Sequence, residues 1–427
     1  MNEREDGYDR RSLPARLRWT AALVAVAAAA TCWFVARGDI ARLMSAYLIG
    51  FLFWWQVTIG CLGLLALFHL VAARFGRAAL PHLASGAAML PLMALLFVPI
   101  AMNVRTVFPW ARENADSGDR HITRHQKLTE ADDEQPFASP FYRALTSENW
   151  PTKNDYLAAR PFVVRAMGYF VVWLTIAWLL GRHSIKVAVS SGPPSPPSRP
   201  SRPGQGLSGA ALVVVVFTAS FAAIDWGMSL DPHWFSTIYP ATFLAGGALS
   251  ALALCAASLA VAFPSGVAIS PSDVAHDVGN LLLAFLMIAA YFAFSQYLII
   301  WSGNLPEESA WFLLRQGGGW SHTILGCVLL LYALPFAWLL SRDRKRSPRG
   351  VALLGVWLLV MRGVEVYWTI APSLYGERFV IEPAAVAATL AIGGIWLFGY
   401  LWLLARCQTV SAAAVPCSPK TPSQGER

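Results

Sequence analysis

Two carboxylates and an imidazole lie close together between two long apolar segments, at Asp225, Asp231 and His233. Such groups can accept and pass on protons near neutral pH. Helical spacing places Asp225 about one turn inside the first apolar segment, whereas Pro232 keeps Asp231 out of helical geometry. An ordinary helix end explains the proline and the neighbouring tryptophans but explains Asp225 poorly. The group is therefore either a proton site or a structural contact.

A second set of polar residues lies within an apolar segment further along the chain. Arg362 and Glu365 are separated by one helical turn and so share a helix face, which Thr369 and Ser373 continue. Ionisable residues in a membrane segment are costly and usually mark function. The pair predicts either a structural ion pair that joins two helices or a site for proton transfer or for a quinone head group. Desolvation offsets much of the attraction, so the pair is weak evidence for stability.

A third set follows one face of the apolar segment that begins near His276. Its members fall within about a 60° arc of the helix: Asp277, Asn280, Tyr291, Ser295 and Ser302. Ala284 and Ile288 interrupt this stripe in the middle. The pattern fits two water-filled half-channels that do not meet, with His276 and Asp277 admitting protons at one end. It fits ordinary hydrogen bonds between helices equally well.

These residues must be positioned by membrane helices. The chain is 56% hydrophobic and 14% charged, whereas about a quarter of the residues in soluble domains are charged. The apolar blocks are long enough to cross a bilayer and do not alternate as barrel strands do. We predict an all-α integral membrane protein with about ten transmembrane helices. The predicted spans cover residues 17–36, 44–71, 82–102, 162–181, 207–227, 237–263, 279–301, 319–341, 350–371 and 384–405.

The net charge of +8 reports topology and indicates no nucleic-acid partner. Lys and Arg residues concentrate on one side of the predicted spans, which places both termini in the cytoplasm. The first apolar segment lacks a cleavage pattern and is predicted to be retained. The chain then divides into a cytoplasmic segment, three helices, a long periplasmic loop, a fourth helix, a Pro/Ser-rich cytoplasmic linker, six helices and a disordered cytoplasmic tail. These parts span residues 1–18, 19–102, 103–160, 161–181, 182–206, 207–406 and 407–427.

Metal and haem sites find little support in the sequence. The six cysteines are scattered, with no CxxC, which argues against an iron–sulfur cluster or covalently attached haem. A haem between helices needs two histidines at matching depth, and His69 and His322 lie near opposite faces. We therefore expect no metal site.

Several motifs carry a family resemblance. The segments "AIDWGMSLDPHWFSTIYP" and "AHDVGNLLLAFLMIAAYFAFSQYLIIWSGNLPEESAWFLLRQGGGW" resemble the ActF-type membrane subunit of bacterial alternative complex III, a quinol:cytochrome c oxidoreductase, and the NrfD or polysulfide-reductase membrane family. Glu365 departs from the pattern, which has Asp there. The signature run W-S-G-N-L-P-E-E contains Trp301, Asn304, Pro306, Glu307 and Glu308.

The resemblance implies a fold of two four-helix bundles plus two extra helices in a bacterial inner membrane. It implies a respiratory-chain subunit that contributes proton conduction or assembly and holds no redox cofactor of its own, with quinone or quinol as its candidate ligand. Its partners would be an NrfD-like sister membrane subunit, an iron–sulfur protein, and multihaem and monohaem cytochromes. The proton-relay candidates are Asp225, Asp231, His233, His276, Asp277, Tyr291, Ser295, Arg362 and Glu365.

Two other functions remain open from the residues alone. Ten spans with intramembrane charges are compatible with a solute transporter, although the sequence shows no internal repeat and no paired broken helices, which transporters often have. A purely structural membrane anchor would use the same polar residues as interhelical bonds.

Overall fold

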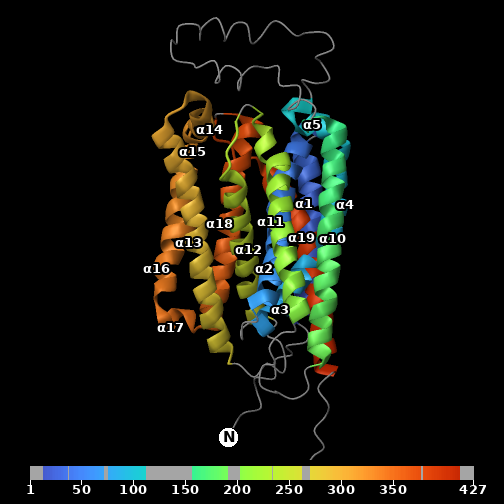
Figure 1. Ribbon diagram of the computed structural model, residues 1–427. Coiled ribbons are helices and arrows are strands. Elements are labelled where there is room, and N and C mark those ends of the chain that lie inside the picture. Colours follow the sequence, from blue (N-terminus) through green and yellow to red (C-terminus); the bar gives the residue numbers. More distant parts are fainter. Residues whose placement is uncertain are drawn as a thin grey trace, which may run out of the picture.

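The computed structural model describes residues 13–36, 38–71, 76–111, 156–190, 202–232, 234–261, 270–376 and 378–413. Within these ranges the chain is helical and has no strand. Ten segments of this described part are long and apolar enough to cross a membrane, so the predicted all-α membrane protein is confirmed. The helices stand side by side, with α5 and α14 at one end and α17 at the other (Figure 1). We call these ends the α14 end and the α17 end.

One group of helices comes from the first half of the chain. Helix α2 lies at its centre and packs against α3, α4 and α11, while α10 packs against α4 and α11. The bounds of this group are α1 (Leu13–Ala36), α2 (Ile40–Val71), α3 (Gly76–Ala87), α4 (Leu90–Met102), α5 (Val104–Val107), α10 (Ala159–Ser190) and α11 (Arg202–Trp226).

A second group comes from the second half, in which α12 packs against both α13 and α18, and α1 pairs with α19 beside the two groups. Segments α15, η2 and α16 form one continuous span whose middle turn is π-helical. The bounds are η1 (Met228–Leu230), α12 (Tyr239–Val261), α13 (Pro271–Gly303), α14 (Pro306–Gln316), α15 (Trp320–Gly326), η2 (Cys327–Ala333), α16 (Leu334–Leu340), α17 (Arg342–Lys345), α18 (Pro348–Tyr375) and α19 (Pro383–Ala413).

Close contact between α2 and α12 joins the two groups. A Cβ atom added at Gly60 would overlap the main-chain carbonyl of Gly247 on α12. Small residues allow such approach in a membrane, where van der Waals packing drives helix association. The glycine-rich stretch of α12 therefore brings α2 within reach of the second group.

Aromatic side chains fill the first group. Trp226 of α11 lies 4.8 Å from Trp55 of α2 and 4.8 Å from Phe97 of α4, measured between ring centroids. Phe170 and Trp173 of α10 close the cluster from the side. Rings at these separations bury large areas and attract one another. Aromatic rings thus fill the interior of the first group of helices.

Several predicted span ends differ from the helices. Helix α10 runs to Ser190 and α19 to Ala413, so the first residues of the predicted linker and of the predicted tail are helical. The third span is broken into α3 and α4 around Ala88 and Met89, because Pro91 begins a new helix there and has no N–H to donate. The seventh span begins at Pro271, well before residue 279. Most of the predicted periplasmic loop, from 112 to 155, and residues 191–201 and 414–427 lie outside the described residues.

Candidate functional site

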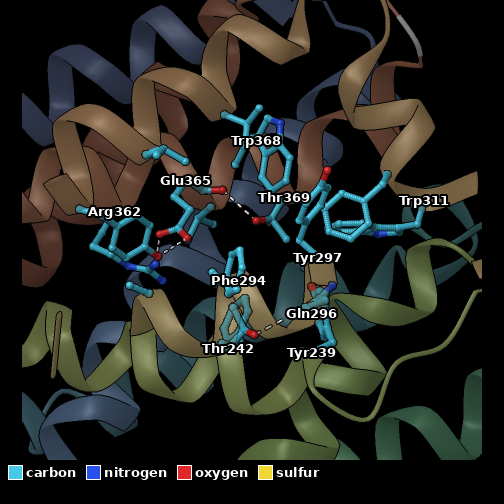
Figure 2. Close-up of a pocket in the computed structure, with 18 of the residues that line it drawn as sticks. Tyr239, Thr242, Phe294, Gln296, Tyr297, Trp311, Arg362, Glu365, Trp368 and Thr369 are labelled. Atoms are coloured by element: carbon cyan, nitrogen blue, oxygen red, sulfur yellow. Dashed lines mark hydrogen bonds and ion pairs between the residues drawn. The ribbon is translucent and has the colours of Figure 1, made fainter. Parts of the chain in front are cut away.

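A cavity of about 550 Å³ lies within the second group of helices. Its walls come from α12, α13, α14, α15, η2 and α18, and one residue of α2 reaches it. Most lining residues are apolar or aromatic, among them Phe243, Phe294, Trp311, Phe312 and Trp368. Binding pockets for small molecules have this size and this mixture of apolar walls with few polar groups. Figure 2 shows Arg362 and Glu365 on one side and Trp311 and Tyr297 on the other.

The predicted pair forms the polar side of this cavity. Arg362 Nη1 donates to Glu365 Oε2, and the two residues are 3% and 7% exposed. Arg362 Nη2 also donates to Gln56 Oε1 of α2 at 3.2 Å. Tyr332 of η2 donates its hydroxyl to Glu365 Oε1 at 2.7 Å. Three helical segments, α18, α2 and η2, therefore contribute to one buried hydrogen-bonded ion pair, and these hydrogen bonds help to offset the cost of burying the charges.

Glycine residues of α12 make room for the pair. A Cβ atom at Gly246 would overlap the guanidinium of Arg362, and one at Gly247 would come within 3.0 Å of the Gln56 side chain. Gln56 Nε2 is held in turn by the carbonyl of Phe243 at 2.5 Å. The sequence analysis did not identify Gln56 or Tyr332, because nothing in the spacing of α18 shows which residues of other helices face it.

One hydrogen-bond donor of the pair is left over. Arg362 Nε is buried and has no hydrogen-bond partner in the described structure. Buried donors are nearly always paired, so this N–H is an exception, and its own surface is closed to the cavity. Both residues of the pair line the cavity, so the guanidinium of Arg362 and the carboxylate of Glu365 offer a donor and an acceptor at one side of a mostly apolar space.

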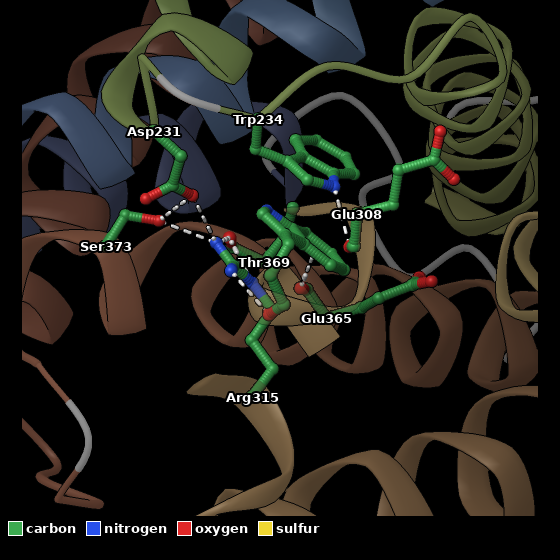
Figure 3. A network of polar contacts seen from close by, with 8 residues as sticks. Asp231, Trp234, Glu308, Arg315, Glu365, Thr369 and Ser373 are labelled. Atoms are coloured by element: carbon green, nitrogen blue, oxygen red, sulfur yellow. Dashed lines mark hydrogen bonds and ion pairs between the residues drawn. The ribbon is translucent and has the colours of Figure 1, made fainter. Parts of the chain in front are cut away.

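A second network lies at the α14 end (Figure 3). Arg315 of α14 is 1% exposed and donates through Nη2 to Asp231 Oδ2 at 3.2 Å, to Ser373 Oγ at 2.6 Å and to the carbonyl of Thr369 at 2.7 Å. Ser373 donates to the same Asp231 oxygen at 2.7 Å. Burial lowers the pKa of Arg315 to about 10, against the opposing attraction of Asp231, so this guanidinium stays charged at neutral pH.

Thr369 links this network to the cavity. It lines the cavity, and its hydroxyl donates to the main-chain carbonyl of Glu365 at 2.8 Å. The face of α18 that was predicted from spacing therefore runs from Arg362 to Ser373 and ends at Asp231. The sequence analysis treated Arg315 only as a charge that reports topology, because its burial under α18 depends on the fold of α14.

Asp225 belongs to a different place. It is fully buried at the end of α11 and accepts from Arg165 Nε at 2.9 Å, from Arg165 Nη2 at 3.2 Å and from the Tyr169 hydroxyl at 2.9 Å. These partners come from α10, and none of the three residues lines the cavity. Asp225 and Asp231 are thus neighbours in sequence but serve separate networks. His233, the third member of the predicted group, lies outside the described residues.

The residues of the stripe predicted on α13 lie in separate surroundings and not along one path. At the α17 end, His276 Nδ1 lies 3.6 Å from Asp277 Oδ1, and Lys345 donates to Asn280 Oδ1 at 2.7 Å. Tyr291 is 65% exposed on the side of the bundle. Neither Tyr291 nor Ser295 lines the cavity; other α13 residues do, such as Phe294 and Gln296. The two half-channels stay a prediction. The residues predicted to admit protons, His276 and Asp277, lie at the α17 end.

The signature run forms a chain reversal between α13 and α14. Asn304 adopts a left-handed conformation, with φ of 47°, and ends α13. Pro306 begins α14, and the indole of Trp234 donates to the Glu308 carbonyl at 3.2 Å. Trp301 is 67% exposed, and the Glu307 side chain lies outside the described residues. Helix capping and a turn account for these residue types.

Comparison with known proteins gives a short similarity. No protein-family model matches the chain. It is 31% identical over 102 residues to heme A synthases of Bradyrhizobium sp. strain ORS 278 and strain BTAi1 / ATCC BAA-1182, which is 23% of this chain and 27% of each relative. The chain therefore spans about a quarter of the length of the curated relatives it matches.

These comparisons overturn the assignment to the ActF-type and NrfD-like family. The similarity found is to heme A synthases, over a short part of the chain, and the family resemblance is wrong. The physical reason lies in the motifs that carried it. The W-S-G-N-L-P-E-E run caps one helix and starts the next, a task that membrane proteins of different families share.

Haem or metal ligands are not gathered at the cavity. Among the described residues, no group of three or more His, Cys, Asp or Glu side chains is placed to hold a metal ion. The cavity wall, within the same part of the chain, contains no His, Cys or Met. The buried His82 lies away from the cavity. Its Nδ1 atom is 2.7 Å from Ser258 Oγ, and the Tyr400 hydroxyl donates to the same Oγ at 2.9 Å.

Proposed function

We propose that this chain is the proton-handling membrane subunit of a quinol:electron-acceptor oxidoreductase complex. The observation that carries the proposal is the Arg362–Glu365 pair, buried in a membrane-spanning helix and exposed to a cavity on one side. Buried ionisable groups in membrane proteins usually mark ion or proton pathways. The redox centres would belong to partner chains: an iron–sulfur protein, multihaem and monohaem cytochromes, and a sister membrane subunit.

Protons would move between Glu365 and the α14 end. Glu365 is the acid–base group at the cavity, where Arg362 and Tyr332 hold its carboxylate. The side chain of Asp231 is 24% exposed at the α14 end, so its carboxylate can exchange protons with water, and Arg315 holds it in place. The excess of Lys and Arg near the α17 end supports a cytoplasmic location for that end, in a bacterial inner membrane.

Proton flux through vesicles that contain the purified complex tests the role of Glu365. We expect Glu365→Gln to lower the flux by about a hundredfold or more, a typical contribution of a positioned acid–base group. Tyr332→Phe keeps the ion pair and removes one hydrogen bond to Glu365, so we expect a smaller loss from a well-folded variant. Asp225→Asn is the matched carboxylate control and should leave the flux nearly unchanged. Unaltered flux in both Glu365→Gln and Tyr332→Phe would refute the role.

Membership of a complex is tested separately. The chain should be extracted from its native membrane in mild detergent and captured by a tag. Haem absorbance and iron in the captured assembly are expected if redox partners are present. A lone, colourless chain would contradict the complex and leave a transporter or a structural anchor as the function.

A haem-related activity is the second candidate, favoured by the 102-residue similarity to heme A synthases. Titration of the purified chain with haem tests it. A saturable shift of the haem absorbance band at one haem per chain would support this candidate over proton handling, whereas non-saturable binding would exclude it.

A further inference from the structure

The cavity opens sideways, toward the lipid. Four of its lining residues are also exposed at the side of the bundle: Phe294 is 60%, Tyr297 39%, Leu325 55% and Val328 48% exposed. Two belong to α13 and two to the α15–η2 segment, so the opening lies between these helices. Side chains exposed at the middle of a membrane helix face acyl chains. A molecule dissolved in the bilayer can therefore reach the cavity without crossing water.

The π-helical turn shapes this opening. It occupies Cys327 to Ala333 and adds a residue to one turn of the span. Val328 at its start lines the opening, and Tyr332 near its end donates to Glu365. Within the turn, the main-chain carbonyl of Leu330 accepts a hydrogen bond from the indole N–H of Trp357 at 2.8 Å. Single π turns occur often at functional sites, and here the turn joins the entrance to the polar side of the cavity.

The polar side selects a neutral head group. The charge of Arg362 is balanced by Glu365, with which it forms an ion pair. A phosphate would therefore find no net positive charge to offset the cost of losing its water. A neutral oxygen can instead accept from the guanidinium of Arg362, whose two Nη atoms each have an N–H beyond the one given to Glu365 or Gln56, and a hydroxyl can donate to Glu365.

The remaining walls suit a flat ring. Trp311, Phe312, Trp368 and Phe294 line the space between the ion pair and the far side. Apart from the ion pair, Thr242 and Gln296 also line the space and supply a hydroxyl and an amide, joined by a long hydrogen bond of 3.5 Å. The cavity thus holds two sets of hydrogen-bonding groups among its aromatic walls. A ring that carries two oxygens can contact both sets at once.

We infer that the cavity binds a quinone-type amphiphile, with its ring between Arg362–Glu365 and Thr242–Gln296 and its tail leaving between α13 and α15–η2 into the lipid. This inference deepens the proposed function, on which its physiological meaning rests, by naming the chemical class of the ligand. Binding itself is independent of proton flux and can be measured alone.

Photolabelling in lipid nanodiscs tests the inference. The purified full-length chain, in phosphatidylcholine nanodiscs, is illuminated with a short-tailed azidoquinone, and labelled residues are mapped by mass spectrometry. We expect label on cavity residues of α13, η2 and α18, and its displacement by an unlabelled decyl benzoquinone. Val328→Phe places a larger side chain at the opening and should reduce displaceable label about tenfold, because the ring then occupies part of the path of the ligand tail. Leu329→Phe, one residue along and outside the cavity lining, should leave it unchanged.

Three results would overturn the inference. The first is label that spreads over lipid-exposed faces and is not displaced by unlabelled quinone. The second is equal displaceable label in Val328→Phe and Leu329→Phe, both confirmed as folded by their melting temperatures. The third is a phospholipid that co-purifies with the chain and is lost in Val328→Phe while quinone never competes. If the chain binds quinone and Glu365→Gln leaves the proton flux unaltered, the proton-handling role is refuted and the ligand stands. If Glu365→Gln lowers the flux but the chain shows no displaceable quinone label, the ligand is refuted and proton handling stands.

Discussion

Two arginine–carboxylate pairs of the described residues, Arg165–Asp225 in the first group of helices and Arg362–Glu365 in the second, differ in how completely they are satisfied. Asp225 in the first half accepts three hydrogen bonds, two from Arg165 and one from Tyr169. Glu365 in the second half accepts from Arg362 and Tyr332, while Arg362 keeps one buried N–H without a partner. The first pair lies outside the cavity lining, and the second lines the cavity.

The difference teaches how similar residues acquire different roles. In the first pair, which we call saturated, Asp225 is fully buried away from the cavity, and breaking the pair would leave an unpaired charge in an apolar interior. A partly satisfied pair beside a cavity can exchange one partner for another at lower cost. We therefore propose a structural role for Asp225 and a ligand- or proton-binding role for Glu365.

The largest expected effect comes from breaking the saturated pair. Arg165→Met leaves Asp225 charged and buried, and we expect the free energy of unfolding to fall by about 3–5 kcal/mol. Denaturation of the purified chain in mixed detergent micelles measures it. The double variant with Asp225→Asn should recover part of the loss, because no charge is then left unpaired. Wild-type stability in Arg165→Met would show that the pair is not structural.

The α18 site shows what the sequence could predict. Arg362, Glu365, Thr369 and Ser373 were placed on one face by helical spacing alone, and the structure has them in one connected set. Ten apolar blocks likewise predicted ten spans, because the length and polarity of a membrane helix are local properties of the chain.

Partners on other helices could not be predicted in the same way. Arg165 lies far from Asp225 in sequence, and Gln56 and Tyr332 reach the ion pair from α2 and η2. Which helices become neighbours depends on the packing of the whole bundle, for which one sequence carries no direct signal. The short motifs at helix ends misled the family assignment for a related reason, since they describe local turns.

A moderate effect is expected where α12 makes room for Arg362. Gly246→Ala would place a Cβ atom into the guanidinium and displace the ion pair, with a loss of about 1–3 kcal/mol from overpacking. Gly363→Ala is the matched control in α18, because its nearest neighbour would be Phe53 at an ordinary 3.9 Å. Denaturation in micelles compares the two. Equal stability would mean that α12 can move aside and that the pair is not held rigidly.

Displaceable quinone label measures ligand binding in the same variants and so separates the two pairs by function as well as by stability. Gly246→Ala should lower quinone labelling as well as stability, because it shifts the groups that contact the ring. Arg165→Met, wherever the chain stays folded, should lower stability and leave labelling intact. The contrary result is a loss of labelling in both variants when equal amounts of folded chain are compared. The two halves would then be coupled, and the pairs could no longer be divided into a structural one and a ligand-binding one.

The smallest expected effect lies in the network that joins the cavity to the α14 end. Ser373→Ala removes a hydrogen bond of 2.7 Å to Asp231 and one of 2.6 Å from Arg315. Arg315 keeps the carbonyls of Thr369 and Trp311 as acceptors, so we expect a loss of about 1 kcal/mol, typical of one hydrogen bond.

Ser302→Ala serves as the control for this change. Its hydroxyl donates only locally, to the carbonyl of Ile299 at 3.2 Å, on an exposed surface, and surface changes usually stay within about 0.5 kcal/mol. If Ser373→Ala instead costs as much as Arg165→Met, then Asp231–Arg315 is a third saturated structural pair. Proton release at the α14 end would then need a route that bypasses Asp231, because a carboxylate so firmly held cannot give up its partners to exchange a proton.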